Sequence, residues 1–361
     1  MKKSKKKPKK QQQKIMVSLM ILLLLIILFI ILNNSSLNKN ISKEKKKIKE
    51  NLTAKTREEK KLNIVDENSN QRPIAIMIDN NVGNNSHVGL ADAYITYEIS
   101  VEGGLTRIMA LYKDVDTKMI GPVRSSRHYF LDYALESDAI YAHYGWSPYA
   151  ETDIKNLKVN NINGLTDTNV YWREKNIKAP HNVFTSTQKI YDSLKDYNYK
   201  KTTTNWRLLN YNVTNIDLTN IQNQQDKIKK ADNIVIKYSN YQTRSYKYDN
   251  NTKEYLRYMN NSPHIDKQTK MQYKYKNVII EKVQKSILDD YGRLDLNTTG
   301  TGEGYYMTNG YILPITWTKQ TRTSQTIYKY LDNTEIKVND GNTFIQIIPS
   351  NYDIEVTQEE Q

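Results

Sequence analysis

The longest apolar stretch of the chain runs from Ile15 to Leu32, and its one polar residue is Ser18. At about 1.5 Å per residue, a helix over this stretch would extend about 27 Å, close to the thickness of a bilayer's hydrocarbon layer. A cleaved signal peptide is the closest alternative. The stretch is longer than the apolar core of a usual signal peptide, and Asn33-Asn34-Ser35-Ser36 follows it. We therefore predict a transmembrane anchor over residues 15–32.

Beyond this anchor the pattern changes twice. Residues 33–70 are rich in Lys, Glu, Asn and Ser and are predicted to be a charged linker. Over residues 71–205, continuous apolar runs alternate with helical patterns, which is typical of a mixed α/β domain. Over residues 230–350, short alternating runs are separated by turns with Asn, Asp and Gly, which indicates a β-rich domain. The predicted fold class is therefore α+β, with an α/β domain followed by a β-rich domain.

The pattern also locates individual elements. In the first domain it predicts strands over 73–79, 93–99, 105–112 and 139–144, a helix over 126–135, and a second helix that begins at Ser147-Pro148. In the second domain it predicts strands over 234–238, 245–248, 255–258, 278–283, 304–307, 312–318, 326–330, 335–338 and 344–348. Thr299 to Gly304 contains a GxGxG pattern that opens no helix, so we interpret it as a turn rather than a nucleotide-binding loop.

The charge of the chain is distributed unevenly. Residues 1–61 contain 18 Lys and Arg against 4 Asp and Glu, which equals the net charge of +14 of the whole chain, so the remainder is neutral. Basic residues around an apolar segment favour contact with anionic lipid headgroups, whereas a nucleic-acid-binding domain usually has a basic patch on the fold. The expected partner of this segment is therefore membrane lipid, and no nucleic acid is expected.

The lysines on either side of the apolar segment also indicate its orientation in the membrane. The basic tail, residues 1–14, has eight Lys, and residues 33–52 have six. This bias is small, but a short N-terminal tail normally stays inside. We predict a single-pass protein of the cell membrane with its N-terminus inside and its folded domains outside the cytoplasm. The reverse orientation would place the folded domains in the cytoplasm.

The chain contains no cysteine. Disulfides, thiolate zinc sites, iron–sulfur clusters, a Cys nucleophile and a diacylglycerol anchor are therefore excluded. A metal pair of His143 and His181 would need a third ligand that the spacing does not identify. We expect no cofactor and no metal site.

Polar residues gather where the predicted strands of the first domain end, and such ends tend to converge on one edge of an α/β sheet. Three interpretations are open. In the first, an anion such as phosphate or carboxylate binds guanidinium groups and backbone N–H groups at a helix start; the residues are Asn80, Arg107, Arg124, Ser125, Arg127 and Arg173. In the second, Asp79, Glu98 or Glu102 acts with His143 or His181 in acid–base catalysis. In the third, Arg–Glu pairs and capping groups only stabilise the fold.

Several motifs together resemble the YerB-type family, two-domain bacterial envelope lipoproteins without an assigned activity. The motifs of the first domain are RPIAIMIDN (72–80), ADAYITYE (91–98), VEGGLTRIMALY (101–112), IGPVRSSR (120–127), YAHYGWSPYA (141–150) and APHNVF (179–184). The later motifs include Val235–Tyr238, Arg257, His264, Asp266, Asn277-Val278, Gly302–Tyr306, Ile315–Lys319 and Phe344–Pro349. The resemblance covers nearly all of residues 71–349, and it implies two domains in this order outside the cytoplasm.

The chain departs from the family pattern in two ways. It has no lipobox Cys, so the apolar segment would replace the lipid as anchor. Asn85-Ser86-His87-Val88 stands where the family usually has Arg-Pro-Gln-Ser, which puts any role of that Arg in doubt. The leading hypothesis is an envelope protein that binds or scaffolds an anionic wall polymer or an envelope partner. The alternative is a wall-directed hydrolase or transferase.

Overall fold

The computed structural model describes residues 14, 16–29, 42–47, 61–81, 83, 85–221 and 224–358. The chain separates into two units, residues 1–60 and residues 61–361. In the first unit, residues 16–29 and 42–47 are helical and exposed. No helix among these described residues is long and apolar enough to cross a membrane. The predicted tail, parts of the predicted anchor over 15–32 and most of the linker lie outside the described residues.

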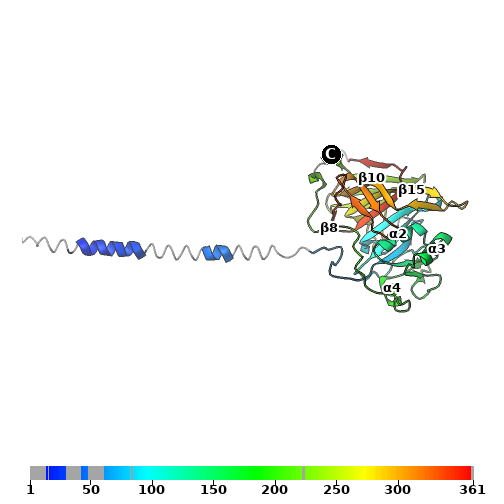
Figure 1. Ribbon diagram of the computed structural model, residues 1–361, viewed down its shortest axis with the longest axis horizontal. Helices are drawn as coiled ribbons and strands as arrows, with labels where there is room; N and C mark the ends of the chain where they lie inside the picture. The colour runs from blue at the N-terminus through cyan, green and yellow to red at the C-terminus, as the bar shows by residue number, and fades with distance from the viewer. Residues whose placement is uncertain are drawn as a thin grey trace, which may run out of the picture. The chain divides into compact units, whose positions relative to one another are not determined.

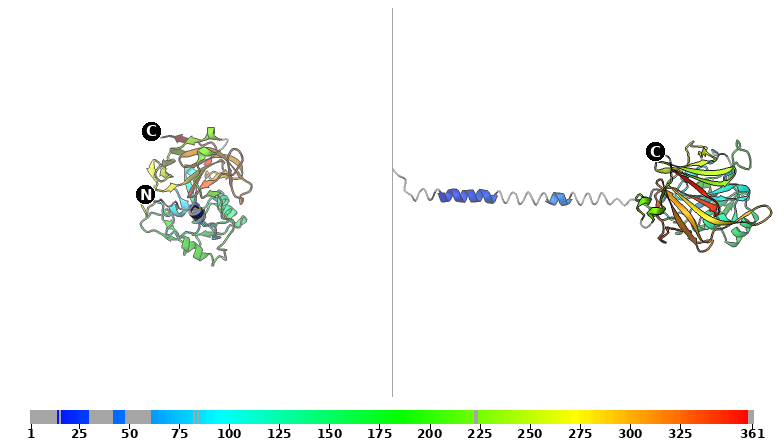
Figure 2. Two further views of the ribbon diagram at one scale, coloured as in Figure 1. Left: turned by 90° about the vertical axis from the view of Figure 1, so that its left-hand side faces the viewer. Right: turned by 90° about the horizontal axis from the view of Figure 1, so that it is seen from above.

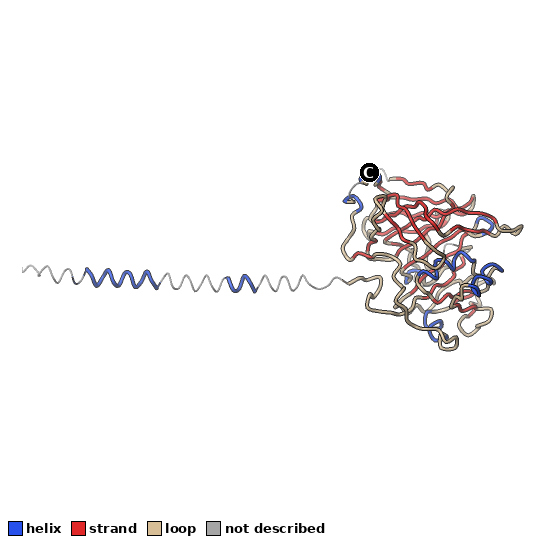
Figure 3. The backbone as a smooth tube through the Cα atoms, viewed as in Figure 1, coloured by secondary structure: helices blue, strands red, loops and turns tan. Residues whose placement is uncertain are grey.

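The second unit is built mainly of strands, and helices are few (Figure 3). Within its described residues, twelve strands form one sheet whose main path is β19-β18-β17-β15-β21-β2-β3-β1-β4-β5. Its members are β1 (Ile74–Asp79), β2 (Ile95–Ser100), β3 (Thr106–Tyr112), β4 (Ile140–His143), β5 (Asn161–Asn163), β9 (Lys229–Lys230), β15 (Asn277–Ile287), β16 (Leu294–Asn297), β17 (Gly300–Thr308), β18 (Tyr311–Lys319), β19 (Ile327–Lys329) and β21 (Thr343–Pro349).

A second sheet of six strands follows the order β13-β12-β11-β10-β22, with β14 paired to β12. Its bounds are β10 (Asn233–Ser239), β11 (Gln242–Asp249), β12 (Glu254–Met259), β13 (Ser262–Pro263), β14 (Lys274–Tyr275) and β22 (Ile354–Thr357). Two short pairs, β6 (Trp172–Arg173) with β7 (Val183–Phe184) and β8 (Tyr211–Asn212) with β20 (Val338–Asn339), complete the described strands. The helices are α2 (His128–Glu136), α3 (Pro148–Asn156) and α4 (Thr187–Ser193), with 3-10 turns η1 (Leu90–Asp92), η2 (Glu102–Gly104), η3 (Leu218–Asn220) and η4 (Gln225–Lys227).

The large sheet joins the two halves of the sequence. β21, near the C-terminus, lies between β2 of the first half and β15 of the second, and it runs parallel to both. Figures 1 and 2 show this red to orange segment running beside the cyan strands of the first half. The two predicted domains therefore share one continuous sheet.

Both faces of the large sheet are buried, because alternate residues of its strands enter two different cores. In β1, Ala75 and Met77 pack in the core that contains α2, whereas Ile74, Ile76 and Ile78 pack in the core that contains the six-stranded sheet. This explains why β1 appears in the sequence as a continuous apolar run instead of an alternating one.

Most predicted strands are confirmed, as is the helix start at Ser147, whose side chain accepts a hydrogen bond from the N–H of Ala150. The predicted turn over residues 299–304 is wrong, since residues 300–308 form β17. Gly302 is needed there because a Cβ atom would lie 2.4 Å from the indole Nε1 of Trp317 on β18. The folded unit also begins earlier than the predicted end of the linker, since Val65 is buried in the core.

Candidate functional site

An ion cluster lies where β1 ends. Asp79 is the last residue of β1 and pairs in register with Arg107 of the antiparallel strand β3. Its carboxylate Oδ2 lies 2.6 Å from Nδ1 of His181 and 3.2 Å from Nε of Arg124. The Asp79 side chain is 2% exposed, whereas those of Arg124 and His181 are 27% and 31% exposed. The cluster therefore presents a guanidinium and an imidazole to solvent over a buried carboxylate.

Two further arginines, Arg107 of β3 and Arg127 just before α2, bind backbone oxygens of the loop that leads into α2. Arg107 donates from NH1 to the backbone oxygen of Ser125 at 2.6 Å, and Arg127 donates from NH1 to the backbone oxygen of Ser126 at 2.9 Å. Arg127 also forms a two-pronged ion pair with Glu102. Burial, and then repulsion by Arg127, lowers the pKa of Arg107 to about 10, so Arg107 stays charged at neutral pH. We call Asp79, Arg107, Arg124, Arg127 and His181 the arginine ledge.

The acidic partner Glu102 is committed to Arg127. Burial alone would raise its pKa, but the hydrogen bonds and charge of Arg127 outweigh burial and lower the pKa. Glu102 is therefore a carboxylate at neutral pH and suits an ion pair better than a proton donor. With Arg127 paired in this way, the guanidinium N–H groups of the ledge that form no hydrogen bond or ion pair with the described residues belong to Arg124 (NH1 and NH2) and Arg107 (Nε and NH2).

Arg173 lies on the hairpin β6–β7, next to the ledge. It donates from NH1 to Oδ1 of Asn182 at 2.6 Å and from NH2 to the hydroxyl of Tyr144 at 3.2 Å. Asn182 directly follows His181, and the N–H of Tyr144 donates to the backbone oxygen of Arg124 at 3.0 Å. Arg173 is thus connected to the ledge through both neighbours.

His143 occupies a different environment. It is fully buried at the end of β4, with Nδ1 bound to the backbone oxygen of Gly145 at 2.8 Å and Nε2 bound to Oδ1 of Asn161 at 3.1 Å. Burial lowers its pKa to about 4. The neutral ring donates from one nitrogen only, and protein atoms enclose both nitrogens, so the geometry favours a structural role for His143. His181 is the partly exposed imidazole of the two. Among the described residues, no three His, Asp or Glu side chains are grouped to hold a metal ion.

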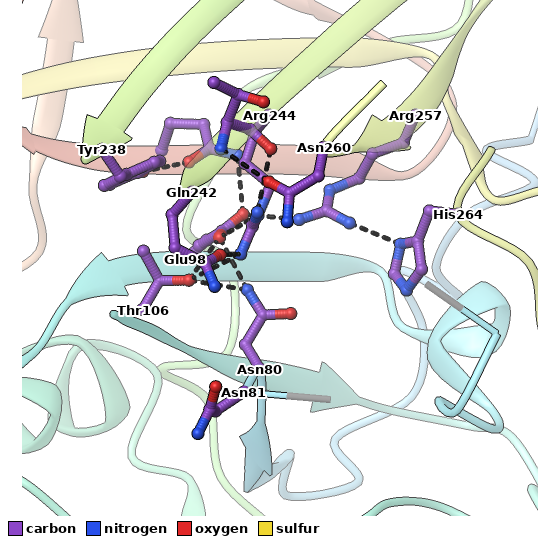
Figure 4. A network of polar contacts seen from close by, with 12 residues as sticks. Asn80, Asn81, Glu98, Thr106, Tyr238, Gln242, Arg244, Arg257, Asn260 and His264 are labelled. Atoms are coloured by element: carbon purple, nitrogen blue, oxygen red, sulfur yellow. Dashed lines mark hydrogen bonds and ion pairs between the residues drawn. The ribbon is translucent and has the colours of Figure 1, made fainter. Parts of the chain in front are cut away.

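Asn80 and Glu98 belong to a second, buried cluster that joins the two sheets (Figure 4). Oε1 of Glu98 accepts hydrogen bonds from Asn80, Thr106 and Arg244, each at 2.7 Å. Oε2 accepts from Arg257 at 2.6 Å and from Gln346 at 3.0 Å. Burial alone would raise the pKa of Glu98, but Arg244 and Arg257 lower it to about 2. The side chain of Asn80 points toward Glu98 (Figure 4).

A chain of hydrogen bonds connects this buried cluster to the ledge. A guanidinium can only donate, so NH1 of Arg257 donates to Nδ1 of His264. Nε2–H of His264 therefore donates to Nδ1 of His87 at 2.8 Å, and Nε2–H of His87 donates to the backbone oxygen of Asp79 at 2.6 Å. Burial lowers the pKa of His87 to about 4 and that of His264 well below its usual value, so both rings are neutral. Residues of the second half of the chain thus hold the backbone of Asp79 in place through His87.

Local sequence reasoning did not place Arg244, Gln346 or His87 in any site. Their signal is weak, because a single polar residue at a buried position of a strand looks like any other polar residue. The burial pattern of β12 alternates, and Arg257 occupies a fully buried position. A charged residue at a strand position that the alternating pattern predicts to be buried is a usable signal for a buried ion pair.

Residues 61–200 match the N-terminal domain, and residues 234–345 the C-terminal domain, of the family described as protein of unknown function DUF3048. The chain belongs to this family. The C-terminal match begins within β10, so it supplies Arg244, Arg257 and His264, and the N-terminal match supplies Glu98 and the ledge.

Two comparisons agree with the family. The putative lipoprotein YerB of Bacillus subtilis is 26% identical over 306 residues, which cover 84% of this chain and 87% of that protein. The crystal structure of the YerB protein from Bacillus subtilis is similar with a TM-score of 0.70 at 26% identity, over 81% of this chain and 96% of that chain. The two-domain family suggested by the sequence motifs is therefore confirmed.

Proposed function

We propose that this chain is an envelope-associated binding module that retains an anionic wall component or an acidic envelope partner on the arginine ledge. One observation carries the proposal: Arg124 and Arg107 have guanidinium N–H groups that no described residue uses, near the partly exposed imidazole of His181. Guanidinium groups bind phosphate and carboxylate with short, charge-assisted hydrogen bonds. The buried Asp79 holds Arg124 and His181 in position.

The proposal includes a membrane anchor. The relative from Bacillus subtilis is named as a putative lipoprotein, and this chain has no cysteine to carry a lipid. The apolar segment over residues 15–32 would take the place of the lipid, with the N-terminus inside and residues 61–361 outside. Protease treatment of wall-stripped cells that express the chain tests this. Digestion of the C-terminal epitope in intact cells is expected, and protection until lysis would overturn the topology.

Binding is tested with the full chain in detergent and with poly(glycerol phosphate) as the anionic probe. We expect Arg107→Gln combined with Arg124→Gln to weaken retention by about 100-fold or more, because two charged hydrogen bonds are lost and each is worth about 1.5–3 kcal/mol. Retention by the wild type should fall with added salt. Arg207→Gln is the matched control, since it removes an arginine whose side chain is 47% exposed and paired to Glu67, apart from the ledge. Equal retention by the double variant and the control would refute the ledge as an anion site.

A second candidate, a wall-directed hydrolase or transferase, is favoured by the 2.6 Å contact between Asp79 and His181. A carboxylate bound to Nδ1 orients an imidazole so that Nε2 can take a proton from a substrate or a water molecule. The test is release of soluble fragments from purified wall material. In an enzyme, His181→Gln should abolish release even at wall concentrations that saturate the protein. Unchanged release in this variant, or no release by the wild type, would exclude this role for the pair.

A further inference from the structure

A small aromatic pocket opens on the hairpin β6–β7. Its volume is about 210 Å³, and its lining residues are Tyr144, Gly164, Thr168, Tyr171, Trp172 and Arg173. Sites for drug-sized ligands usually measure about 300–1,000 Å³. This pocket therefore has room for one ring-sized group rather than an extended molecule.

The aromatic wall of the pocket depends on a glycine. A Cβ atom at Gly164 would lie 2.3 Å from Cδ2 of Tyr144 and 2.9 Å from Cδ2 of Tyr171, so only glycine leaves room for both rings. The two rings meet edge to face with centroids 5.9 Å apart, and the hydroxyl of Tyr171 donates to the backbone oxygen of Ile162 at 2.8 Å. The wall is therefore fixed by packing and by a buried hydrogen bond.

Polar groups surround the aromatic surface. The guanidinium of Arg173 lies over the ring of Tyr144, 5.1 Å from its centroid. The indole N–H of Trp172 donates to Oε1 of Glu174 at 2.7 Å, which fixes the orientation of its ring. Apolar aromatic faces beside the guanidinium of Arg173 and the hydroxyl of Thr168 suit a sugar ring, whose C–H face is apolar and whose hydroxyl groups point outward.

The pocket adjoins the arginine ledge. The guanidinium of Arg173 donates to Asn182, the residue after His181. The backbone N–H of Tyr144 donates to the backbone oxygen of Arg124. A ligand with a ring in the pocket would therefore have its charged group within the neighbourhood of Arg124 and His181.

We infer that the pocket is a sugar subsite and that the ligand unit is a pyranose ring carrying a phosphate or carboxylate group. The ring stacks on Trp172, beside Tyr144 and Arg173, and the charged group binds the ledge. This inference rests on the proposed function and narrows its ligand from an anionic polymer to an anionic glycan.

The test compares three probes on the full chain in detergent, with saturation-transfer NMR and titration calorimetry. N-acetylglucosamine 6-phosphate has ring and charge, glucuronic acid replaces phosphate by carboxylate, and glycerol phosphate has charge without ring. We expect both charged sugars, the sugar phosphate and the uronic acid, to bind about tenfold more tightly than glycerol phosphate. Trp172→Ala should remove this advantage while leaving glycerol phosphate binding unchanged, and Trp172→Phe should restore most of it.

Controls separate the two ideas. Tyr291→Ala removes an aromatic ring that is 82% exposed and lies outside the pocket, and it should change nothing. Thermal unfolding checks that each variant is folded. If glycerol phosphate binds in a manner that depends on Arg124 but the sugar ring adds no affinity, the subsite inference fails and the anion site stands. If no anionic probe binds the wild type, both fail.

Discussion

The buried Glu98 cluster and the arginine ledge are both built from arginines, a carboxylate and histidines, yet they differ in what their charges face. Both oxygens of Glu98 are saturated by protein donors, and the Glu98, Arg244 and Arg257 side chains are fully buried. On the ledge, Asp79 is equally buried, but Arg124 and His181 reach solvent. The first arrangement leaves no room for a ligand, and the second leaves donors available for one.

The difference shows that charge composition alone does not identify a site. A buried ion pair must overcome the cost of removing both ions from water, and it often contributes more to the choice of one arrangement than to stability. Here the cluster connects β2 and β3 of one sheet with β11 and β12 of the other. Its geometry can therefore fix how the two sheets pack, whereas the ledge has donors that a ligand can use.

The largest expected effect comes from Glu98→Ala. It leaves the guanidinium groups of Arg244 and Arg257 buried without their carboxylate, so the free energy of unfolding should fall by about 3–5 kcal/mol. Urea unfolding of the full chain measures this. Asp116→Asn is the control, because its partner Lys118 is exposed and the loss should stay below about 1 kcal/mol. A loss of less than 1 kcal/mol in Glu98→Ala would break the comparison between the two regions.

The change of the free energy of unfolding with pH should be nearly as large as the effect of Glu98→Ala. The pKa values of His87 and His143 are lowered from 6.5 to about 4 by burial, so the unfolded chain binds protons between these values that the folded chain does not. Stability should therefore fall as the pH decreases from 6.5 toward 4, by up to about 3 kcal/mol for each residue. Unfolding curves at pH 7, 6 and 5 test this. His87→Gln should flatten the slope, and an unchanged slope would contradict the assignment.

A buried carboxylate elsewhere should show the opposite sign. Glu281 accepts hydrogen bonds from the hydroxyls of Tyr133 and Tyr328, and burial raises its pKa from 4.5 to about 7. The folded chain holds an extra proton in this range, so the contribution of Glu281 to stability is lost as the pH rises through 7. Between pH 5 and 8, the stability of Glu281→Gln relative to wild type should rise by up to roughly 3 kcal/mol. If the difference in stability between the variant and wild type stayed constant from pH 5 to 8, Glu281 would be ionised over this whole range.

The smallest effect on stability is expected at the ledge. Arg124→Gln should cost less than about 1 kcal/mol, since its side chain is partly exposed and Asp79 keeps His181 and the N–H of Asn81 as partners. The same variant should still weaken retention of an anionic polymer. Thermal unfolding and the retention assay on one preparation separate the two properties. A stability loss as large as that of Glu98→Ala would mean that the ledge, too, is structural.

Much of the fold was predictable because its signals are local. The apolar run over residues 74–79, the Ser147-Pro148 helix start and the alternation in β10 each depend on neighbours within a few positions. The error over residues 299–304 has a tertiary cause: the glycines there accommodate the indole of Trp317 and the backbone of Ile280 on neighbouring strands. A glycine cluster that serves packing looks, in sequence, like one that makes a turn.

The candidate site divides in the same way. Asp79, Arg107, Arg124 and Arg127 were identifiable because strand ends and the following loop converge on one edge of a sheet. That Asn80 turns inward and that His143 is enclosed were not identifiable, since neighbouring residues on a strand face opposite sides and burial depends on what covers each side.

The sequence by itself determined the strand-rich α+β character, the two-part organisation, the neutral charge of the folded region and the gathering of arginines after β1. Only the tertiary structure decided that β21 joins both halves into one sheet and that Glu98 meets Arg244 and Arg257. These partners lie 146 and 159 residues apart in the chain. Periodicity reports which face of a strand is buried, but the choice of partner across such distances depends on packing and on the pairing of buried charges.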